Sequence, residues 1–492
     1  MLFNSAGFIF IFMPLTIAGF AVAVRLRSTA VAIAVLIVAS YAFYGWWEPW
    51  LPALLGASTA FNFTIGWSIT HAARRKRPAL VRILLWIGIA GDLGLLGYFK
   101  YADFFIANVD AVTGLSNPLP TIALPIGISF YTFTQIAFLA DAAQGRIERL
   151  RLADYVLFVS YFPHLIAGPI IHHRATIPQF RRIAADGWDI GAIAVGLSIF
   201  AIGLFKKIIL ADSVAPFADA VFSNAAAGPP PLLDGWIGSI AYAFQIYFDF
   251  SGYSDMAIGL SLLFGVRLPV NFASPYKSTS IVEFWSRWHM SLSAFLRDYL
   301  YIPLGGNRKG AARRYANLMV TMLLGGLWHG AAWTFVIWGG LHGLYLVINH
   351  AWRFAFGPPS PDPAPSIVWL KRVSVCLAVT IAWVFFRSDS FTAASNMFAG
   401  MSGTHGFAAD SNHATSLGWL AVCVFIVWAL PNTYQLFARF NPTLPLPAKL
   451  GDAPADFLAW RVNAASAMAL GSLFAGCILA INRFSPFLYF RF

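Results

Sequence analysis

The amino-acid sequence predicts an all-α polytopic membrane protein, with about ten transmembrane crossings and two re-entrant elements around a central cavity or tunnel. Composition is the first observation: 59% of the 492 residues are hydrophobic and only 11% are charged, against roughly 25% charged in soluble domains. The second is a series of apolar runs of membrane-spanning length. The third is that most Lys and Arg residues fall in short connections between these runs, as in cytoplasmic loops.

The apolar runs define the expected helices. The first run follows no basic segment and precedes no small-residue cleavage site, so we expect a retained span and not a removed signal peptide. The runs cover residues 6–24, 28–46, 50–70, 78–99, 121–141, 152–171, 191–210, 236–262, 315–349, 367–386, 416–438 and 463–482.

Basic residues predict the orientation of the chain. They follow the first, third and fifth runs, whereas the loops at 47–49 and 102–120 have none. Because cytoplasmic loops are enriched in Lys and Arg, the N-terminus is expected outside. The same rule places residues 212–235 and 388–415 outside, and residues 266–314 and 439–462 inside.

Two runs break the alternation. Residues 152–171 and 315–349 are each flanked by basic residues on both sides, so we expect both to dip into the membrane and return. The second run, at about 35 residues, would measure roughly 52 Å as a helix, too long for one crossing of a ~30 Å core. Irregular backbone at membrane depth must be buried in protein or face water, which predicts a central cavity.

We expect residues 1–492 to form one membrane-embedded domain, with most motifs between residues 121 and 350 and the longest polar connection at 266–314. The formal charge of +12, from 33 basic and 21 acidic residues, reflects cytoplasmic loops and does not indicate nucleic-acid binding. The three cysteines lie far apart in apolar runs and indicate neither disulfides nor a metal site.

His329 is the most unusual polar residue of the apolar runs. It lies in the sequence Gly-Gly-Leu-Trp-His-Gly-Ala-Ala-Trp, and no Lys, Arg, Asp or Glu occurs in residues 315–349. An ionisable group in hydrocarbon costs roughly 2.5–3.5 kcal/mol or more and usually lines a polar path. We therefore expect His329 at the base of the cavity, with Trp328 and Trp333 lining it; the alternative is a packing histidine with both nitrogens satisfied.

A second histidine lies in the cytoplasmic connection. Ser280 and Glu283 have the spacing of a capping box, and the pattern predicts an amphipathic helix from there to about Tyr299. His289 would share its polar face with Ser286, Ser293 and Arg297. The alternative is an interfacial anchor with an incidental histidine.

Basic residues close this connection. Arg308 and Lys309 follow two glycines and, with Arg297, could bind the phosphates of a nucleotide-bearing donor or anionic lipid.

Two further polar groups lie within apolar runs. Gln245 and Asp249 share a helix face at i,i+4, with Lys206 and Lys207 as the nearest expected partners. Asp249 is either half of a structural ion pair or, with Gln245, part of the cavity lining. His164, in the proline-flanked run at 152–171, either lines the cavity or packs.

These stretches together resemble the membrane-bound O-acyltransferase family, in its bacterial polysaccharide-acetylating branch. Over residues 284–289 the chain reads Phe-Trp-Ser-Arg-Trp-His, and over 296–308 it reads Leu-Arg-Asp-Tyr-Leu-Tyr-Ile-Pro-Leu-Gly-Gly-Asn-Arg. The resemblance implies that His329, in the Trp-His-Gly element, is the catalytic histidine and that His289 is a second functional one.

The resemblance also implies a reaction and a location. We expect a bacterial inner-membrane O-acetyltransferase that moves acetyl from acetyl-CoA, on the cytoplasmic side, to hydroxyls of an extracytoplasmic polysaccharide. Transfer would be direct or through a periplasmic acetyltransferase, with no bound cofactor. Open alternatives are D-alanyl transfer to teichoic acid, fatty acyl transfer to lipid, and a non-enzymatic transporter with a proton-relay histidine.

Overall fold

The computed structural model of the chain describes residues 1–115, 122–147, 149–183, 187–358, 360, 362–408, 413–445, 459–481, 487 and 488. Over these residues the secondary structure consists of helices and contains no strand. The expected all-α class is therefore confirmed. The chain divides into two compact units, which are described separately below; the expectation of a single domain stays a prediction.

The first unit comprises Met1–Phe200, Tyr253–Val270 and Phe440–Leu446. Helices α3, α4 and α6 pack against one another in it, and Gly66 and Gly88 allow this because a Cβ at either would collide with an α6 side chain, Phe138 or Leu139. The helices that begin in this unit are α1 (Met13–Arg25), α2 (Thr29–Gly45), α3 (Leu51–Arg74), α4 (Pro78–Leu96), α5 (Ala102–Thr113), α6 (Ile128–Ala143), α7 (Leu152–Ser160), α8 (Phe162–Leu165), α9 (His173–Phe180) and α10 (Ile190–Phe205).

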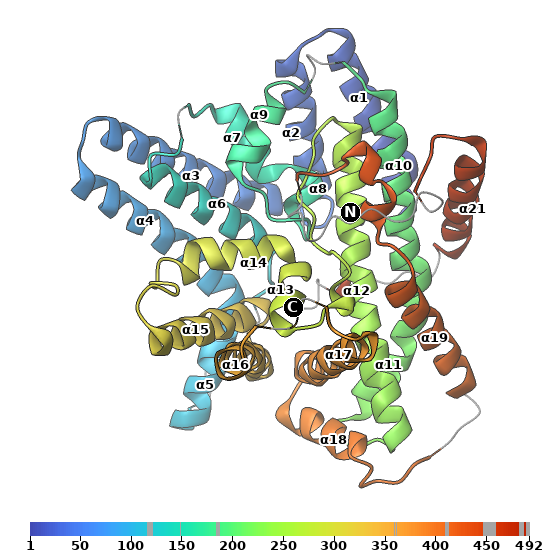
Figure 1. Cartoon of the computed structure of the whole chain (residues 1–492). Helices are drawn as coiled ribbons and strands as arrows, with labels where there is room; N and C mark the ends of the chain where they lie inside the picture. The colour runs from blue at the N-terminus through green and yellow to red at the C-terminus, as the bar shows by residue number, and fades with distance from the viewer. Residues whose placement is uncertain are drawn as a thin grey trace. The chain divides into compact units, whose positions relative to one another are not determined.

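The second unit comprises Ala201–Gly252, Asn271–Arg439 and Pro447–Phe492. Its most extensive helix pairing is between α15 and α16, which lie side by side (Figure 1). Its helices are α11 (Asp212–Asn224), α12 (Leu232–Leu263, which ends in the first unit), α13 (Ile281–Arg287), α14 (Met290–Leu296), α15 (Ala311–His329), α16 (Trp333–Phe356), α17 (Pro365–Arg387), α18 (Phe391–Met401), α19 (His413–Ala429), α20 (Thr433–Leu436) and α21 (Ala464–Ala480).

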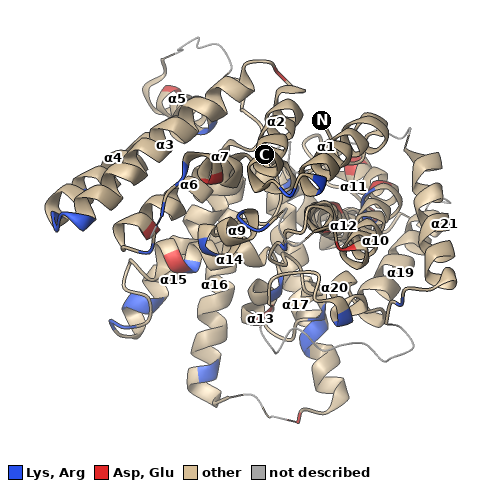
Figure 2. Ribbon diagram, turned by 90° about the horizontal axis from the view of Figure 1, so that it is seen from above, with Lys and Arg blue, Asp and Glu red and all other residues tan. Residues whose placement is uncertain are grey.

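Four helical stretches are long and apolar enough to cross a membrane: Phe8–Arg25, Pro78–Thr113, Ile190–Asn224 and Pro365–Arg387. Charged residues are sparse along the helices, and α3 and α16 are free of them over most of their length (Figure 2). The expected count of about ten crossings stays a prediction.

Two predicted boundaries were wrong. The runs predicted to end at residues 99 and 210 continue as helix to Thr113 and Asn224. Hydropathy marks where a helix stops being apolar, whereas backbone hydrogen bonding can continue beyond that point. The predicted loops at 102–120 and 212–235 therefore begin with helix.

The two runs predicted to dip and return are both interrupted. Run 152–171 contains α7, of nine residues, and α8, of four; nine residues span only about 13 Å, too little to cross. Run 315–349 falls within the hairpin of α15 and α16, which returns the chain to the side from which it came.

Glycines explain how the hairpin closes. A Cβ at Gly326 would collide with the carbonyl oxygen of Phe335, and one at Gly339 with that of Met322. A Cβ at Gly330, which follows α15 in an extended conformation, would collide with the Phe335 ring. Small residues thus let the two backbones approach closely.

Candidate functional site

His289 interrupts the helix that the sequence predicts. The expected helix from Glu283 to Tyr299 is two helices, α13 and α14, and His289 lies between them in a left-handed conformation with φ 42°. His289 is only 1% exposed, whereas the Arg297 side chain is 61% exposed. The prediction that the two residues share one polar helix face was therefore wrong. Tertiary contacts to His289 override the local amphipathic pattern.

The helix start is close to the prediction. The Ser280 hydroxyl accepts a hydrogen bond from the Glu283 backbone N–H at 3.2 Å, as an N-cap should. The Glu283 carboxylate, however, accepts from the backbone and hydroxyl of Thr279 and not from Ser280. It also pairs with Arg287 at 2.9 Å.

Asn271 holds the His289 imidazole. The Asn271 Oδ1 atom lies 3.2 Å from His289 Nδ1 and also accepts hydrogen bonds from the backbone and hydroxyl of Ser291. Because Oδ1 can only accept, His289 Nδ1 carries the proton in this bond. In the neutral imidazole Nε2 therefore has the lone pair.

The Nε2 atom of His289 is buried and has no hydrogen-bond partner among the described residues. Burial lowers the pKa of His289 from 6.5 to about 3, because the charged form loses its hydration. His289 is thus a neutral proton acceptor at ordinary pH, the form that a general base needs.

His329 is the last residue of α15 and lies beside His289. The ring centroids of the two histidines are 6.4 Å apart, and His329 is 6% exposed. Trp338 and Phe386 pack edge-on against the His329 ring, at 5.1 and 5.3 Å. The structure therefore brings together the two histidines to which the family resemblance assigns a function; their catalytic roles stay predictions.

Trp328 belongs to this cluster, whereas Trp333 is placed differently. The Trp328 ring lies 4.9 Å from His329 and 6.3 Å from His289. Trp333 begins α16 and is 52% exposed. The prediction that both tryptophans line a tunnel stays a prediction.

A third histidine, His342, also belongs to this site, although the sequence did not predict it. His342 Nδ1 accepts a hydrogen bond from Trp285 Nε1 at 3.3 Å, and the His342 ring lies 4.9 Å from Trp338. The neutral His342 therefore carries its proton on Nε2. His342 Nε2 and Trp338 Nε1 are buried donors without a partner among the described residues.

Asp249 belongs to a buried ion network. Lys207 Nζ lies 2.7 Å from Asp212 and 2.8 Å from Asp249, and the backbone N–H of Leu488 donates to Asp249 Oδ2 at 3.0 Å. The expected lysine partner is thus Lys207, and these contacts favour the structural alternative for Asp249. Gln245 is buried on the same helix, and its Oε1 has no partner among the described residues.

The remaining predicted site residues lie outside the histidine cluster. His164, in the first unit, is buried and its Nε2 bonds to the Phe158 carbonyl at 2.9 Å. Arg297 pairs with the adjacent Asp298. Arg308 and Lys309 are exposed in the turns before α15. Their roles in the cavity and in donor binding stay predictions, and the described residues contain no cluster suited to a metal ion.

The chain resembles known proteins over most of its length. Residues 83–388 match a model of the membrane-bound O-acyltransferase family. The chain is 40% identical to a probable alginate O-acetylase of Azotobacter vinelandii, over the full length of both. It is 40% identical to a peptidoglycan O-acetyltransferase of Helicobacter pylori, over 82% of this chain and 80% of that protein.

A more distant relative is a teichoic acid D-alanyltransferase of Streptococcus thermophilus, 27% identical over 66% of this chain and 81% of that protein. All three relatives are named as group-transfer enzymes, which argues against the transporter alternative. The chain belongs to the membrane-bound O-acyltransferase family and is a multi-pass membrane O-acyltransferase.

Proposed function

We propose that this protein transfers an acetyl group from acetyl-CoA, on the cytoplasmic side of the bacterial inner membrane, to hydroxyls of an extracytoplasmic polysaccharide. The acceptor receives the acetyl group directly or through a periplasmic acetyltransferase, and the N-terminus lies outside. The observation that carries the proposal is the buried pair of His289 and His329, with ring centroids 6.4 Å apart, in a chain 40% identical to two proteins named as O-acetylating enzymes.

The chemistry needs a proton acceptor beside the acceptor hydroxyl. His329 takes the hydroxyl proton while the oxygen forms a bond to the thioester carbonyl carbon, and His289 Nε2 provides a second acceptor next to it. The C–S bond then breaks, and the imidazolium returns the proton to the leaving thiolate, which regenerates the neutral His329. General-base assistance of this kind contributes about 10²–10⁴-fold to the rate.

The carbonyl oxygen becomes negative as the new bond forms and needs hydrogen-bond donors. Trp338 Nε1 and His342 Nε2 are buried donors of the required type. Trp338 is the nearer of the two to the reaction, because its ring packs against His329. We assign the Trp338 indole N–H to the oxyanion.

The test is acetyl transfer by the purified protein in lipid, supplied with radiolabelled acetyl-CoA and a polysaccharide acceptor. Thioester hydrolysis and label on the polysaccharide are scored for wild type, His329→Ala and His405→Ala, an exposed histidine outside the cluster. We expect His329→Ala to abolish both signals at a normal membrane level, and His405→Ala to match wild type.

Two results would overturn the proposal. Substantial transfer by His329→Ala would remove the assigned base. Transfer from a D-alanyl carrier thioester, with none from acetyl-CoA, would assign the protein to the chemistry named for its S. thermophilus relative.

A further inference from the structure

A pocket of about 270 Å³ lies in the second unit, and all of its lining residues belong to that unit. The lining comes from the end of α16, the two residues after it, residues 279 and 280 before α13, and Lys371 of α17. Sites that enclose a whole organic ligand usually measure about 300–1,000 Å³. The pocket therefore has a size suited to the polar end of a larger molecule.

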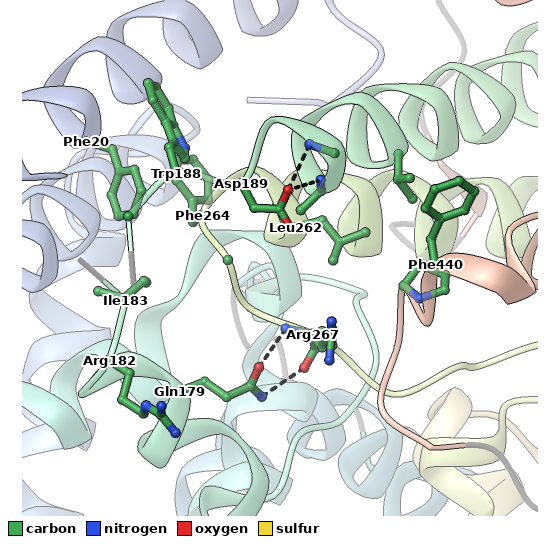
Figure 3. A pocket seen from close by; sticks show the side chains of 16 residues that line it. Phe20, Gln179, Arg182, Ile183, Trp188, Asp189, Leu262, Phe264, Arg267 and Phe440 are labelled. Carbon is green, nitrogen blue, oxygen red and sulfur yellow. Dashed lines mark hydrogen bonds between the residues drawn. The ribbon is translucent and has the colours of Figure 1, made fainter. Parts of the chain in front are cut away.

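The aromatic part of this lining is accessible to a ligand. Trp352 is 62% and Phe356 is 69% exposed, and their rings lie 4.2 Å apart. A pocket of about 690 Å³ in the first unit differs in this respect (Figure 3): its Phe20 and Phe264 are each 1% exposed, and their rings meet edge to face at 5.2 Å. Unlike those two buried rings, Trp352 and Phe356 can pack against apolar groups of a ligand.

Two basic side chains of the lining lack an acidic partner. Among the residues that the structure describes, neither Arg353 nor Lys371 makes an ion pair or a side-chain hydrogen bond. Asp362, the one acidic residue between them in the sequence, is exposed and does not line the pocket. Glu283, near the start of α13, pairs with Arg287 at 2.9 Å. The pocket therefore carries two positive charges that an anion can neutralise.

A buried acceptor adds a third polar group to the lining. Asn349 Oδ1 is buried and has no hydrogen-bond partner among the described residues. Asn349 lies one helical turn before Arg353, on the same face of α16. Because a buried acceptor without a donor costs free energy, a ligand that donates a hydrogen bond to this oxygen removes that cost.

The two cations lie at the ends of charge-free helical segments. Residues 333–352 of α16 and residues 373–386 of α17 contain no Lys, Arg, Asp or Glu. The two helices pack against each other, and the basic segment of α16 lies toward the loop that joins them (Figure 2). α17 is itself long and apolar enough to cross a membrane. Trp, Lys and Arg at such helix ends are typical of the boundary between hydrocarbon and headgroups.

We propose that this pocket binds an anionic glycerophospholipid whose headgroup carries hydroxyls. The lipid phosphate lies between Arg353 and Lys371, a headgroup hydroxyl donates to Asn349 Oδ1, and the glycerol and upper acyl chains lie against Trp352 and Phe356. Guanidinium and ammonium groups bind phosphate oxygens through charge-assisted hydrogen bonds. Basic pockets between membrane helices are a recognised form of lipid site.

The lining discriminates among phosphate-bearing ligands. A free phosphate would leave the exposed rings of Trp352 and Phe356 without a partner. An ammonium headgroup is repelled by the two cations of the lining, whereas a hydroxyl is neutral and can donate to Asn349. An anionic lipid with a hydroxylated headgroup therefore fits the pocket better than a zwitterionic lipid.

The experiment titrates the full-length protein in detergent with phosphatidylglycerol and measures bound lipid by native mass spectrometry. Wild type is compared with Arg353→Gln/Lys371→Gln and with Arg313→Gln, which removes an exposed arginine of α15 in the same unit. We expect the double variant to bind about tenfold more weakly or worse, and Arg313→Gln to bind like wild type. Equal binding by all three proteins overturns the proposal.

Asn349→Leu tests the headgroup contact. The variant keeps a side chain of similar size but loses the acceptor oxygen. Wild type should bind phosphatidylglycerol more tightly than phosphatidylethanolamine, and Asn349→Leu should lose part of this preference. An unchanged preference overturns the assignment of the headgroup hydroxyl to Asn349.

Competition separates the sources of phosphate. The titration is repeated with inorganic phosphate, with coenzyme A and with diacylglycerol, which lacks the phosphate. Binding of phosphatidylglycerol that resists inorganic phosphate and coenzyme A, with no binding of diacylglycerol that depends on Arg353 and Lys371, supports the lipid site. Displacement by coenzyme A with the same dependence on the two basic residues assigns the pocket to a nucleotide and overturns the lipid proposal.

Discussion

The Nδ1 atom of His289 lies 3.2 Å from Oδ1 of Asn271, and both residues are buried. The backbone carbonyl of Asn271 also accepts a hydrogen bond from the backbone N–H of Met290, at 3.0 Å. These bonds hold His289 in its left-handed conformation and set which ring nitrogen carries the proton. Asn271 is thus a positioning residue for the proposed chemistry.

Replacement of Asn271 by Ala should lower kcat about 10-fold to 100-fold, because the imidazole loses its orientation and its tautomer, part of the ~10²–10⁴-fold effect of general-base catalysis. Asn271→Asp keeps the acceptor oxygen and should retain more activity than Asn271→Ala. Steady-state acetyl transfer measures both.

The matched control is Ser291→Ala. It removes the 2.8 Å hydrogen bond from the Ser291 hydroxyl to the same Asn271 oxygen but leaves the bond to His289. Its kcat should stay within a few-fold of wild type. A wild-type kcat for Asn271→Ala would refute the positioning role.

Trp338→Phe tests the contribution of the indole N–H to catalysis apart from that of the aromatic ring. The variant keeps an aromatic ring beside His329 but removes the buried Nε1 donor. Loss of an oxyanion donor costs up to ~10²–10³-fold in kcat, with little change in KM. Trp383→Phe is the control, because it makes the same substitution in the indole ring that stacks on Trp338 at 5.5 Å; equal losses in the two variants would point to packing alone.

Acid should destabilise the protein through His289. Its pKa is about 3 when folded and 6.5 in the unfolded chain. Below pH 6.5 the unfolded chain binds a proton that the folded protein excludes, so the stabilising contribution is present above pH 6.5 and is lost as the pH falls. Between pH 7 and pH 5 this loss amounts to about 2 kcal/mol.

The measurement compares thermal unfolding of wild type and His289→Gln in detergent at both pH values. The other titratable groups are the same in the two proteins, so the difference between their losses of stability on acidification reports on His289. Wild type should lose more stability on acidification than the variant. An identical loss in both proteins would show that His289 does not hold a depressed pKa.

The sequence was sufficient for the features that depend on hydropathy and charge along the chain. Four of the twelve predicted runs lie in helical stretches that are long and apolar enough to cross a membrane, and basic flanks on both sides of residues 315–349 predicted a chain that returns. The absence of Lys, Arg, Asp and Glu in 315–349 singled out His329 as a candidate, and its catalytic role stays a prediction. These signals are local, so no knowledge of packing was needed.

Other parts of the site depend on contacts distant in sequence. The pattern around His289 fits a continuous helix, and only the bonds to Asn271 explain the break. His342 would face away from His329 on one straight helix, but the turn at Gly330 brings it back through Trp338. An amide within the apolar sequence Leu-Pro-Val-Asn-Phe, which must find partners when buried, was the available signal for Asn271.

The Lys207 network gives a test of what Asp249 does. Lys207→Met removes the cation that pairs with the buried carboxylates of Asp212 and Asp249. Because removal of one partner of a buried ion pair is strongly destabilising, the free energy of unfolding should fall by about 3–5 kcal/mol. The double variant Lys207→Met/Asp249→Asn removes one of these charges and should recover part of the loss in thermal unfolding. If Asp249 is structural, the double variant should also regain acetyl transfer in proportion to its folded fraction. A double variant that is as stable as wild type but inactive would instead place Asp249 in the substrate path, the alternative that its intramembrane position left open.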